Sequence, residues 1–358
     1  MIDVLIVDDS AFMRKALSLM LEKDDGIRVA DTARDGREAV SKVEDLRPDV
    51  LTMDVEMPRM NGLEALRIIM DEHPLPVIMV SSLTEEGAEV TLEAMEAGAA
   101  DFIPKKLSYA SLDIVDIEEE LHRKVRGVAD GALARSRHRG TDSGRRTTAR
   151  QADLDRRLEK APEVVAIGVS TGGPRSLQEV IPPLSADFSV PIVLAQHMPP
   201  EFTASMARRL NEASALEVAE VESGEYLEAG RVHVAPGGTH IRIEGTERRP
   251  VLRVVDDELD RPYRPSVDEL FETAAETLGG GVIGAVLTGM GQDGLEGARA
   301  VREAGGVVIA QDEASSVVYG MPKAVSEAGC ADMVLPLGSF ADQFTRLSGL
   351  TRRRSPSG

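Results

Sequence analysis

Several residue types are scarce in this sequence, and each scarcity excludes a class of protein. The chain of 358 residues has a single cysteine, Cys330, so it forms neither an internal disulfide nor a metal site built from several cysteines. Tryptophan is absent and aromatic residues make up only 3%, so the cores must be aliphatic. No apolar run approaches the length of a membrane-spanning helix. Positive charge is also in deficit, and the net charge of −20 argues against sequence-independent binding of nucleic acid.

The first residues indicate the compartment. Met1-Ile2-Asp3-Val4 carries an acid where a signal peptide is basic, and it leads directly into an apolar strand. We therefore expect a cytoplasmic protein without membrane insertion. The length of the chain allows two domains, each with its own core.

Residues 1–122 alternate between short apolar runs and amphipathic stretches of helical period. The runs predict five strands, which are Val4–Val7, Arg28–Ala30, Val50–Met53, Val77–Val80 and Phe102–Ile103. Apolar strands separated by helices form a parallel sheet that is covered on both faces. We therefore predict a first domain with a five-stranded doubly wound sheet of order 2-1-3-4-5.

Charged and hydroxyl side chains follow four of these strands. Asp8 and Asp9 come after the first strand and Asp54 after the third, and in this strand order those ends are neighbours at the topological switch point. Three converging carboxylates repel one another unless a hard cation such as Mg²⁺ joins them. A metal-bound aspartate there can accept a phosphoryl group, with Ser81 and Lys105 at the next two strand ends to contact it. Acids after strands are commonly solvated loop ends, but the full set disfavours that interpretation.

These residues resemble those of a response-regulator receiver domain, and the resemblance covers the whole segment. The stretch Asp54-Val55-Glu56-Met57-Pro58-Arg59-Met60-Asn61-Gly62 is similar to the family's phosphoacceptor loop. The resemblance implies that Asp54 is phosphorylated. It implies that Asp8, Asp9 and Asp54 bind Mg²⁺ together with the backbone carbonyl of Glu56.

The resemblance also places switch residues. Ser81 and Phe102 fall at the positions that respond to phosphorylation in receiver domains. The family usually has Lys-Pro where this chain has Lys105-Lys106, and a cis bond before a residue other than proline costs about 3 kcal/mol. We expect Lys105 to contact the phosphoryl group, with Lys106 as the alternative.

A basic segment separates the two halves of the chain. Residues 123–160 have twelve lysines and arginines against five acids, and they show little apolar periodicity. We therefore predict a receiver domain over 1–122, a flexible basic linker over 123–161, a second domain over 162–350 and a disordered tail over 351–358. Whether the linker is a plain tether or contacts an acidic surface stays open.

Strand and helix alternation resumes after residue 162. The apolar runs are Val164–Val169, Ile192–Ala195, Val232–Ala235, Val282–Thr288, Val307–Ala310 and Met333–Leu337. They predict a second doubly wound parallel sheet. The segment has neither a Gly-x-Gly-x-x-Gly fingerprint nor a Gly-Lys-Ser/Thr phosphate loop, so dinucleotide and nucleoside triphosphate binding are unsupported.

A serine follows the first strand of this domain in a Gly-x-Ser-x-Gly turn. Ser170 stands between Gly168 and Gly172, and helical spacing resumes directly afterwards. Such a turn lifts a serine clear of the sheet, although similar turns also bind phosphate or simply join a strand to a helix. The function of Ser170 therefore depends on its partners.

A nucleophilic serine needs a base, and three histidines of this domain are candidates. His197 follows the second strand and is fixed by two prolines, which suits a general base. His240 follows a glycine-rich turn and competes with it. His233 lies inside a strand pattern, where packing is the simpler interpretation.

The base needs a carboxylate, and Asp293 stands in the glycine-rich turn after strand Val282–Thr288. Its simpler interpretation is the N-cap of the following helix. We expect backbone N–H groups of this turn, at Met290 in particular, to form part of an oxyanion hole. The order Ser170, His197, Asp293 differs from the Ser, Asp, His order of α/β-hydrolases, which argues against that fold.

The domain resembles the catalytic domain of the chemotaxis response-regulator protein-glutamate methylesterases of CheB type. The matching motifs are Gly168-Val169-Ser170-Thr171-Gly172-Gly173, Gln196-His197-Met198-Pro199 and Leu287-Thr288-Gly289-Met290-Gly291-Gln292-Asp293-Gly294. The resemblance implies a triad of Ser170, His197 and Asp293, with Thr171 and Met290 at the oxyanion. Where the family often has a histidine this chain has Tyr263, which argues against a base at that position; Arg261 and Arg264 remain candidate substrate contacts.

The two resemblances together imply a regulated hydrolase. It would remove methyl esters from glutamate side chains of chemoreceptors, and deamidate receptor glutamines, without a cofactor for hydrolysis. A histidine kinase would supply the phosphate, and the unphosphorylated receiver would cover the catalytic cleft. A non-catalytic adaptor and a receiver-controlled transcription factor are the alternatives from other classes; the serine, histidine and aspartate set opposes the first, and the acidic charge opposes the second.

Overall fold

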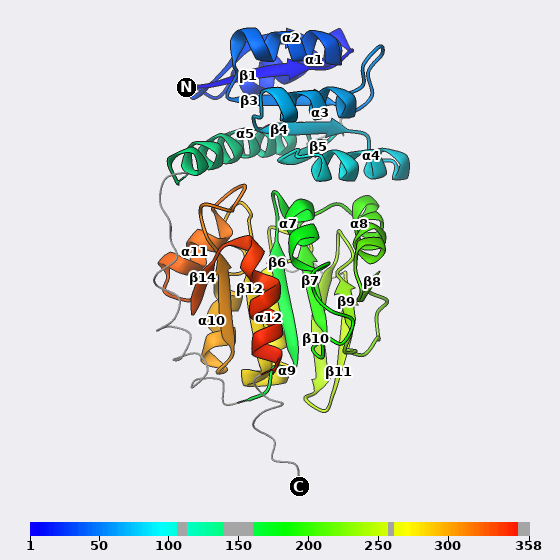
Figure 1. Cartoon of the computed structure of the whole chain (residues 1–358), viewed down its shortest axis with the longest axis vertical. Coiled ribbons are helices and arrows are strands. Elements are labelled where there is room, and N and C mark those ends of the chain that lie inside the picture. Colours follow the sequence, from blue (N-terminus) through cyan, green and yellow to red (C-terminus); the bar gives the residue numbers. More distant parts are fainter. Residues whose placement is uncertain (106–112, 139–159, 257–260, 350–358) are drawn as a thin grey trace. The chain divides into compact units, whose positions relative to one another are not determined.

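A computed structural model describes residues 1–105, 113–138, 160–256 and 261–349 of the chain (Figure 1). The chain divides into two compact units, Met1–Ser136 and Arg137–Gly358, and each is described by itself. Within the described ranges, no helix combines the length and apolar character that a membrane span requires. The tail predicted over 351–358 and most of the predicted linker lie outside the described residues.

The first unit has one five-stranded sheet with the order β2-β1-β3-β4-β5, as predicted. All its pairings are parallel. The strands are apolar runs whose side chains are almost entirely buried in β1, β3 and β4, because helices cover both faces. The strands are β1 Ile2–Val7, β2 Ile27–Ala33, β3 Val50–Asp54, β4 Val77–Ser81 and β5 Asp101–Pro104.

The helices of this unit are α1 Ala11–Leu21, α2 Gly36–Leu46, α3 Gly62–Glu72, α4 Glu85–Glu96 and α5 Asp113–His138. Helix α3 begins with a capping box in which Asn61 and Glu64 bond each other's backbone N–H groups. Its first residue is glycine because a Cβ on Gly62 would lie 2.0 Å from the carbonyl oxygen of Asp54. The local sequence therefore packs α3 directly against the end of β3.

The last helix is longer than predicted. The sequence interpretation ended it near Val125 and assigned residues from 123 onward to the linker, but α5 continues to His138. The basic residues that suggested a linker are compatible with helix, because arginine and lysine are good helix formers. The linker prediction was therefore wrong for residues 123–138.

The second unit has a seven-stranded sheet in which every pairing is parallel. Its order is β14-β13-β12-β6-β7-β9-β8, so the chain starts in the middle and extends first to one side and then to the other. This is the predicted doubly wound topology, with its switch point between β6 and β12. The strands are β6 Val164–Val169, β7 Ile192–Gln196, β8 Glu217–Glu220, β9 Arg231–Val234, β12 Val282–Val286, β13 Val307–Gln311 and β14 Met333–Leu335.

Helices cover both faces of this sheet. One core joins β6, β7, β12 and β13 to α9 Val267–Leu278, α10 Leu295–Glu303 and α11 Met321–Glu327. The other helices are α7 Gly173–Val180, α8 Pro200–Ala213 and α12 Phe340–Gly349, and α12 lies in front of the sheet in Figure 1. Every core side chain of β6 is aliphatic, as the lack of aromatic residues requires.

Three strands were missed from the sequence. They are β8 and an antiparallel hairpin formed by β10 His240–Thr246 and β11 Arg249–Val255. Alternation was visible in the hairpin, since Ile241, Ile243 and Leu252 are buried while Arg242, Glu244 and Arg253 are more exposed. These buried residues join the core beside α9.

Candidate active site

The predicted nucleophile, base and acid follow three adjacent strands. Ser170 comes directly after β6, His197 after β7 and Asp293 after β12, and β6 lies between the other two strands. The three strands are parallel, so their carboxyl ends meet at one edge of the sheet, at the switch point. The topology therefore brings the three predicted residues to one place.

A tight turn presents Ser170. Its N–H donates to the carbonyl of Thr288, and its own carbonyl accepts from the N–H of Gly173 at 2.8 Å. Within this turn, Gly172 has a φ of +78°, which is the left-handed conformation that glycine adopts without strain. The side chain of Ser170 is half-buried, and its hydroxyl has no hydrogen-bond partner within the described part of the chain. The hydroxyl is therefore free to meet a substrate.

His197 and Asp293 are hydrogen-bonded. Nε2 of the imidazole lies 2.7 Å from Oδ2 of the carboxylate, and both side chains are buried. Nδ1 of His197 is buried and has no partner among the described residues. Carboxylate and imidazole thus form a pair in which Nδ1 is the nitrogen left to accept a proton.

The carboxylate of Asp293 also accepts hydrogen bonds from the start of helix α9. Oδ1 accepts from the Ser266 hydroxyl and the Asp268 N–H at 3.0 Å, and Oδ2 accepts from the Val267 N–H at 2.7 Å. Burial acts to raise the pKa of Asp293, but the hydrogen bonds from His197 and these backbone groups hold it below its ordinary value. The carboxylate therefore stays charged beside the imidazole.

Asp293 was also expected to be a plain N-cap of the helix that follows it. It does accept the N–H of Gly294 at 3.1 Å, but Asp268 is the main acceptor there, bonding the N–H groups of Gly294 and Gly297. Burial, with the nearby charge of Asp293, raises the pKa of Asp268. Helices α9 and α10 thus exchange carboxylates: Asp268 of α9 caps the start of α10, and Asp293, in the turn just before α10, accepts N–H groups at the start of α9.

The backbone of the turn after β12 offers a free donor beside Ser170. A Cβ on Gly289 would lie 2.8 Å from the Cβ of Ser170. The carbonyl of Gly289 accepts N–H groups from Gly320 and Met321 at 3.0 and 2.9 Å. The peptide is trans, so the N–H of Met290 points the opposite way, and no described residue accepts it. This N–H suits an oxyanion hole.

Thr171, the other predicted oxyanion residue, is buried next to Ser170. Its carbonyl accepts a hydrogen bond from the Thr288 hydroxyl at 2.9 Å, which ties the serine turn to the turn after β12. Gln311 supports the same turn. Its side-chain oxygen accepts the N–H of Thr288 at 2.7 Å, and its side-chain nitrogen donates to the hydroxyl of Ser315 at 3.2 Å.

Sequence reasoning missed Gln196, the last residue of β7. Its buried amide nitrogen donates to the carbonyl oxygens of Ser170 and His197, each at 3.0 Å. It therefore links the backbone of the nucleophile to that of the base. The only signal in the sequence was a polar residue at the end of an apolar strand.

The other histidines have structural surroundings. His240, the competing base, is fully buried, and its Nδ1 accepts the N–H of Ser266 at 3.3 Å. Burial lowers the pKa of His233 to about 4, inside β9. Both side chains therefore pack within the domain, and His197 alone of the three bonds Asp293.

The two arginines named as substrate contacts already pair with acids. Arg261 bonds Glu272 at 2.5 Å and lies near Asp268. Arg264 lies 3.4 Å from the exposed Asp256. Tyr263, between them, stacks on the ring of His197.

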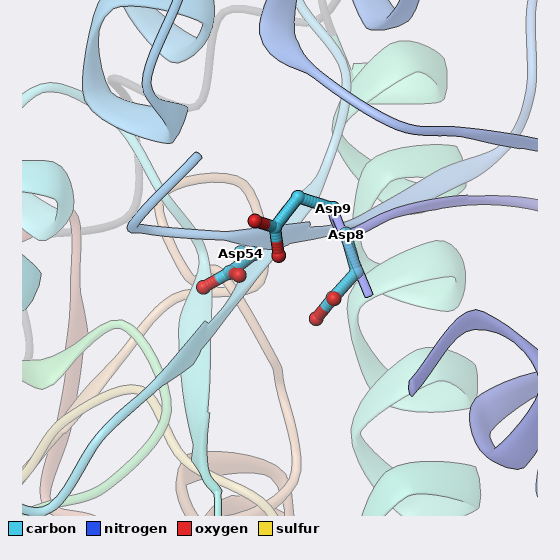
Figure 2. Close-up of side chains that lie close together, drawn as sticks. All are labelled: Asp8, Asp9 and Asp54. Carbon is cyan, nitrogen blue, oxygen red and sulfur yellow. The ribbon is translucent and has the colours of Figure 1, made fainter. Parts of the chain in front are cut away.

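The acidic site of the first unit forms at the carboxyl ends of β1 and β3. Figure 2 shows Asp8, Asp9 and Asp54 close together, with one carboxylate oxygen of each within 4.8 Å of the others. Asp8 and Asp54 are buried and Asp9 is exposed. Oδ2 of Asp8 is buried and has no hydrogen-bond partner in the described part of the chain, apart from the Lys105 ammonium at 3.4 Å, so the donor set fits a hard divalent cation. The N–H of Glu56, whose carbonyl is the further predicted ligand, donates to Oδ1 of Asp54 at 3.2 Å.

Lys105 occupies the position expected for a phosphoryl contact. Its Nζ lies 2.7 Å from Oδ2 of Asp54 and 3.4 Å from Oδ2 of Asp8. Burial raises the pKa of Asp54, although Lys105 opposes the rise. The alternative residue, Lys106, lies outside the described residues.

The two switch residues are held by neighbouring elements. The hydroxyl of Ser81 lies 2.6 Å from that of Thr91 in α4. Phe102 is buried, and the ammonium group of Lys124 lies 5.3 Å from the centre of its ring. Both positions are therefore coupled to helices that flank β4 and β5.

Comparison with known proteins decides the family. The model of the CheB methylesterase family matches residues 165–344, and that of the response regulator receiver domain matches residues 4–114. The chain belongs to the CheB methylesterase family. A protein-glutamate methylesterase/protein-glutamine glutaminase of Oleidesulfovibrio alaskensis is 49% identical over 95% of this chain and 98% of its own. One of Pyrococcus horikoshii is 44% identical over 98% and 95%.

A solved structure supports the same assignment for the second unit. The Thermotoga maritima CheB methylesterase catalytic domain is 43% identical, with a TM-score of 0.51, over 52% of this chain and 100% of that domain. A CheB methylesterase with a receiver domain implies phosphorylation-regulated adaptation in chemotaxis, and a receiver domain in general implies Mg²⁺ binding and a kinase as phosphodonor.

Proposed function

We propose that this protein hydrolyses the methyl esters of glutamate side chains in chemoreceptors, through a triad of Ser170, His197 and Asp293. Nδ1 of His197 takes the proton of the Ser170 hydroxyl, whose oxygen attacks the ester carbonyl carbon. Asp293 holds the imidazole through Nε2 and stabilises the imidazolium. The proton then passes to the departing methoxide, which leaves as methanol, and water hydrolyses the acyl-enzyme to free the glutamate.

The negative oxygen of the tetrahedral intermediate needs donors. The free N–H of Met290 is one, and we assign Thr171 as the second because its backbone follows the nucleophile directly. The same acyl chemistry converts a glutamine side chain to glutamate, with ammonia as the leaving group. Methyl ester and amide hydrolysis therefore need one site and no metal.

The observation that carries the proposal is the hydrogen-bonded pair of His197 and Asp293, at a strand end next to a serine whose hydroxyl bonds none of the described residues. The names of the relatives, protein-glutamate methylesterase/protein-glutamine glutaminase, agree with the chemistry that this pair allows. Three strand ends of one sheet supply the residues, and this is where parallel α/β domains bind ligands.

The test is release of methanol from receptor membranes that carry methyl esters. We expect Ser170→Ala to lower the rate by at least about 10³-fold, because the nucleophile is lost. Ser185→Ala is the matched control, since Ser185 is exposed in the connection that leads to the amino end of β7. Undiminished methanol release by Ser170→Ala would contradict the proposal.

We further propose that phosphorylation of Asp54 controls this activity. Asp8, Asp9, Asp54 and the backbone carbonyl of Glu56 would hold Mg²⁺, which offsets negative charge at the phosphoryl group. Lys105 would bind a phosphoryl oxygen, and the Ser81 hydroxyl would turn toward it, away from Thr91. A chemotaxis histidine kinase is the proposed donor.

An acyl phosphate in the presence of Mg²⁺ tests the control. We expect it to raise methanol release by the wild type by about 5- to 150-fold, which is the usual range of such coupling. Asp54→Asn should not respond, whereas Asp45→Asn, on the surface of α2, should respond like the wild type. Equal responses of both variants would refute the role of Asp54.

A further inference from the structure

The ring of Tyr263 lies flat against the imidazole of His197. The ring centroids are 4.2 Å apart and the planes differ by 7°. Tyr263 stands three residues before Ser266, the N-cap of α9, and the N–H groups that follow Ser266 bond Asp293. The short segment from Tyr263 to Asp268 therefore bonds the acid that holds the imidazole, and it also carries the ring that covers the face of the imidazole.

The same tyrosine reaches the turn that carries the oxyanion donor. A Cβ on Gly291 would lie 3.1 Å from the Tyr263 hydroxyl oxygen, so glycine at this position leaves room for the phenol. The half-buried Tyr263 side chain is thus confined between the loop after β7 and the turn after β12. Its ring has little freedom to leave the imidazole.

Within the described part of the chain, hydrogen bonding fixes the imidazole at one nitrogen alone. Nε2 bonds Asp293, but Nδ1 has no partner among the described residues. A ring held at one nitrogen still turns about its bond to Cβ, and that rotation moves Nδ1 away from the serine. A flat aromatic neighbour opposes the rotation, since stacked rings attract each other by about 0.5–1.5 kcal/mol beyond their burial.

We propose that Tyr263 is a positioning residue for His197, which rests on the proposed role of His197 as the base. The tyrosine ring keeps Nδ1 directed at Ser170. It also favours the imidazolium, because the face of an aromatic ring attracts a cation. The charged imidazole exists only once the serine proton has moved, so the contact strengthens toward the transition state and acts on kcat more than on KM.

The test compares two replacements of Tyr263 in the full chain, with methylated receptor membranes as substrate. Tyr263→Leu removes the ring, and we expect kcat to fall by about tenfold with KM within about twofold. Tyr263→Phe keeps the ring and should restore most of the rate. Tyr226→Leu is the matched control, because Tyr226 also faces a cation, Arg249, but on the surface and away from the site.

A second variant keeps the test decisive if the leucine variant does not fold. A trifluorinated phenylalanine at position 263 preserves a flat ring but removes its negative face, and we expect kcat to fall relative to phenylalanine. An unchanged kcat in this variant overturns the preference for the imidazolium, and equal losses in the leucine and phenylalanine variants overturn the positioning role of the ring.

The proposed triad is tested separately in the same assay. His197→Ala should abolish activity whatever residue occupies position 263. If His197→Ala retains the wild-type rate, the triad is wrong. If it is inactive while the Tyr263 variants behave like the wild type, the triad stands and the positioning role fails.

Discussion

Replacing Gly320 by alanine should disable the oxyanion hole without touching the triad. The N–H of Gly320 bonds the carbonyl of Gly289 at 3.0 Å, and this bond fixes the peptide that carries the N–H of Met290, the proposed oxyanion donor. The φ of Gly320 is −103°, outside the left-handed region that favours glycine, so the effect of the substitution comes from the space around the added Cβ.

The size of the effect follows from the space around Gly320. The new Cβ would lie 2.6 Å from the carbonyl oxygen of Gly289 and 3.1 Å from the Cα of Met290, whereas ordinary contact begins at 3.4 Å. The peptide must therefore move by about 0.8 Å. A hydrogen bond lengthened by that amount is lost, and loss of one oxyanion donor costs about 10²- to 10³-fold in kcat.

The assay is methanol release at saturating substrate, with calorimetry to check folding. We expect kcat to fall by about 10²-fold and KM to change little, because the donor acts on charge that develops in the transition state. Gly338→Ala is the control, since its Cβ would have nothing within 4 Å. A folded Gly320→Ala enzyme with wild-type kcat would refute the assignment of this peptide.

Three further predictions concern buried polar groups. Gln196→Ala removes the amide that bonds the carbonyls of Ser170 and His197. We expect the unfolding free energy to fall by about 2–4 kcal/mol, measured by calorimetry, and kcat to fall more than about tenfold, measured by methanol release. His233 has a pKa of about 4 when folded and 6.5 as its ordinary value, so the unfolded state takes up its proton first as pH falls. The stability that neutral His233 provides is complete above pH 6.5 and is lost toward pH 4. Between these pH values the unfolding free energy of the wild type should therefore fall by up to about 3 kcal/mol more than that of His233→Leu, measured by thermal unfolding. Thr91→Val removes the shortest of the hydrogen bonds that hold the Ser81 hydroxyl in the unphosphorylated receiver. A loss of about 1 kcal/mol shifts the equilibrium about fivefold, which should raise methanol release at limiting acyl phosphate.

The meeting of His197 and Asp293 followed from the sequence because a parallel sheet gathers its strand ends. Each residue stood after an apolar run, and a doubly wound order brought those runs together near Ser170. The resemblance to a known family then chose His197 over His240. Burial of His240 within the hairpin side of the domain gives the physical reason for that choice.

The contacts that hold the site could not be predicted in this way. Gln196 bonds a carbonyl of the neighbouring strand, and Tyr263 stacks on a residue 66 positions earlier in the chain. Gly320 has an ordinary φ, so its need for glycine arises only from a peptide packed against it. Each contact depends on tertiary packing, whereas periodicity reports local structure.

The predicted linker failed for a different reason. Charge dominated the interpretation of residues 123–138, although helix propensity there is high and the structure has α5 continuing through them. The hairpin of β10 and β11 was missed although its alternation was present. In both cases a local signal existed, and for residues 123–138 it was outweighed by charge.

The exchange of carboxylates between α9 and α10 has a consequence for how this domain can change over time. Asp293 caps one helix as well as holding the base, and Asp268 returns the cap to the other helix. A copy of the domain that lost its serine, and with it all turnover, would still be stabilised by both acids at the starts of these helices. Asp293 would therefore be retained after the activity was lost, and its presence in a descendant would indicate the helix arrangement rather than catalysis.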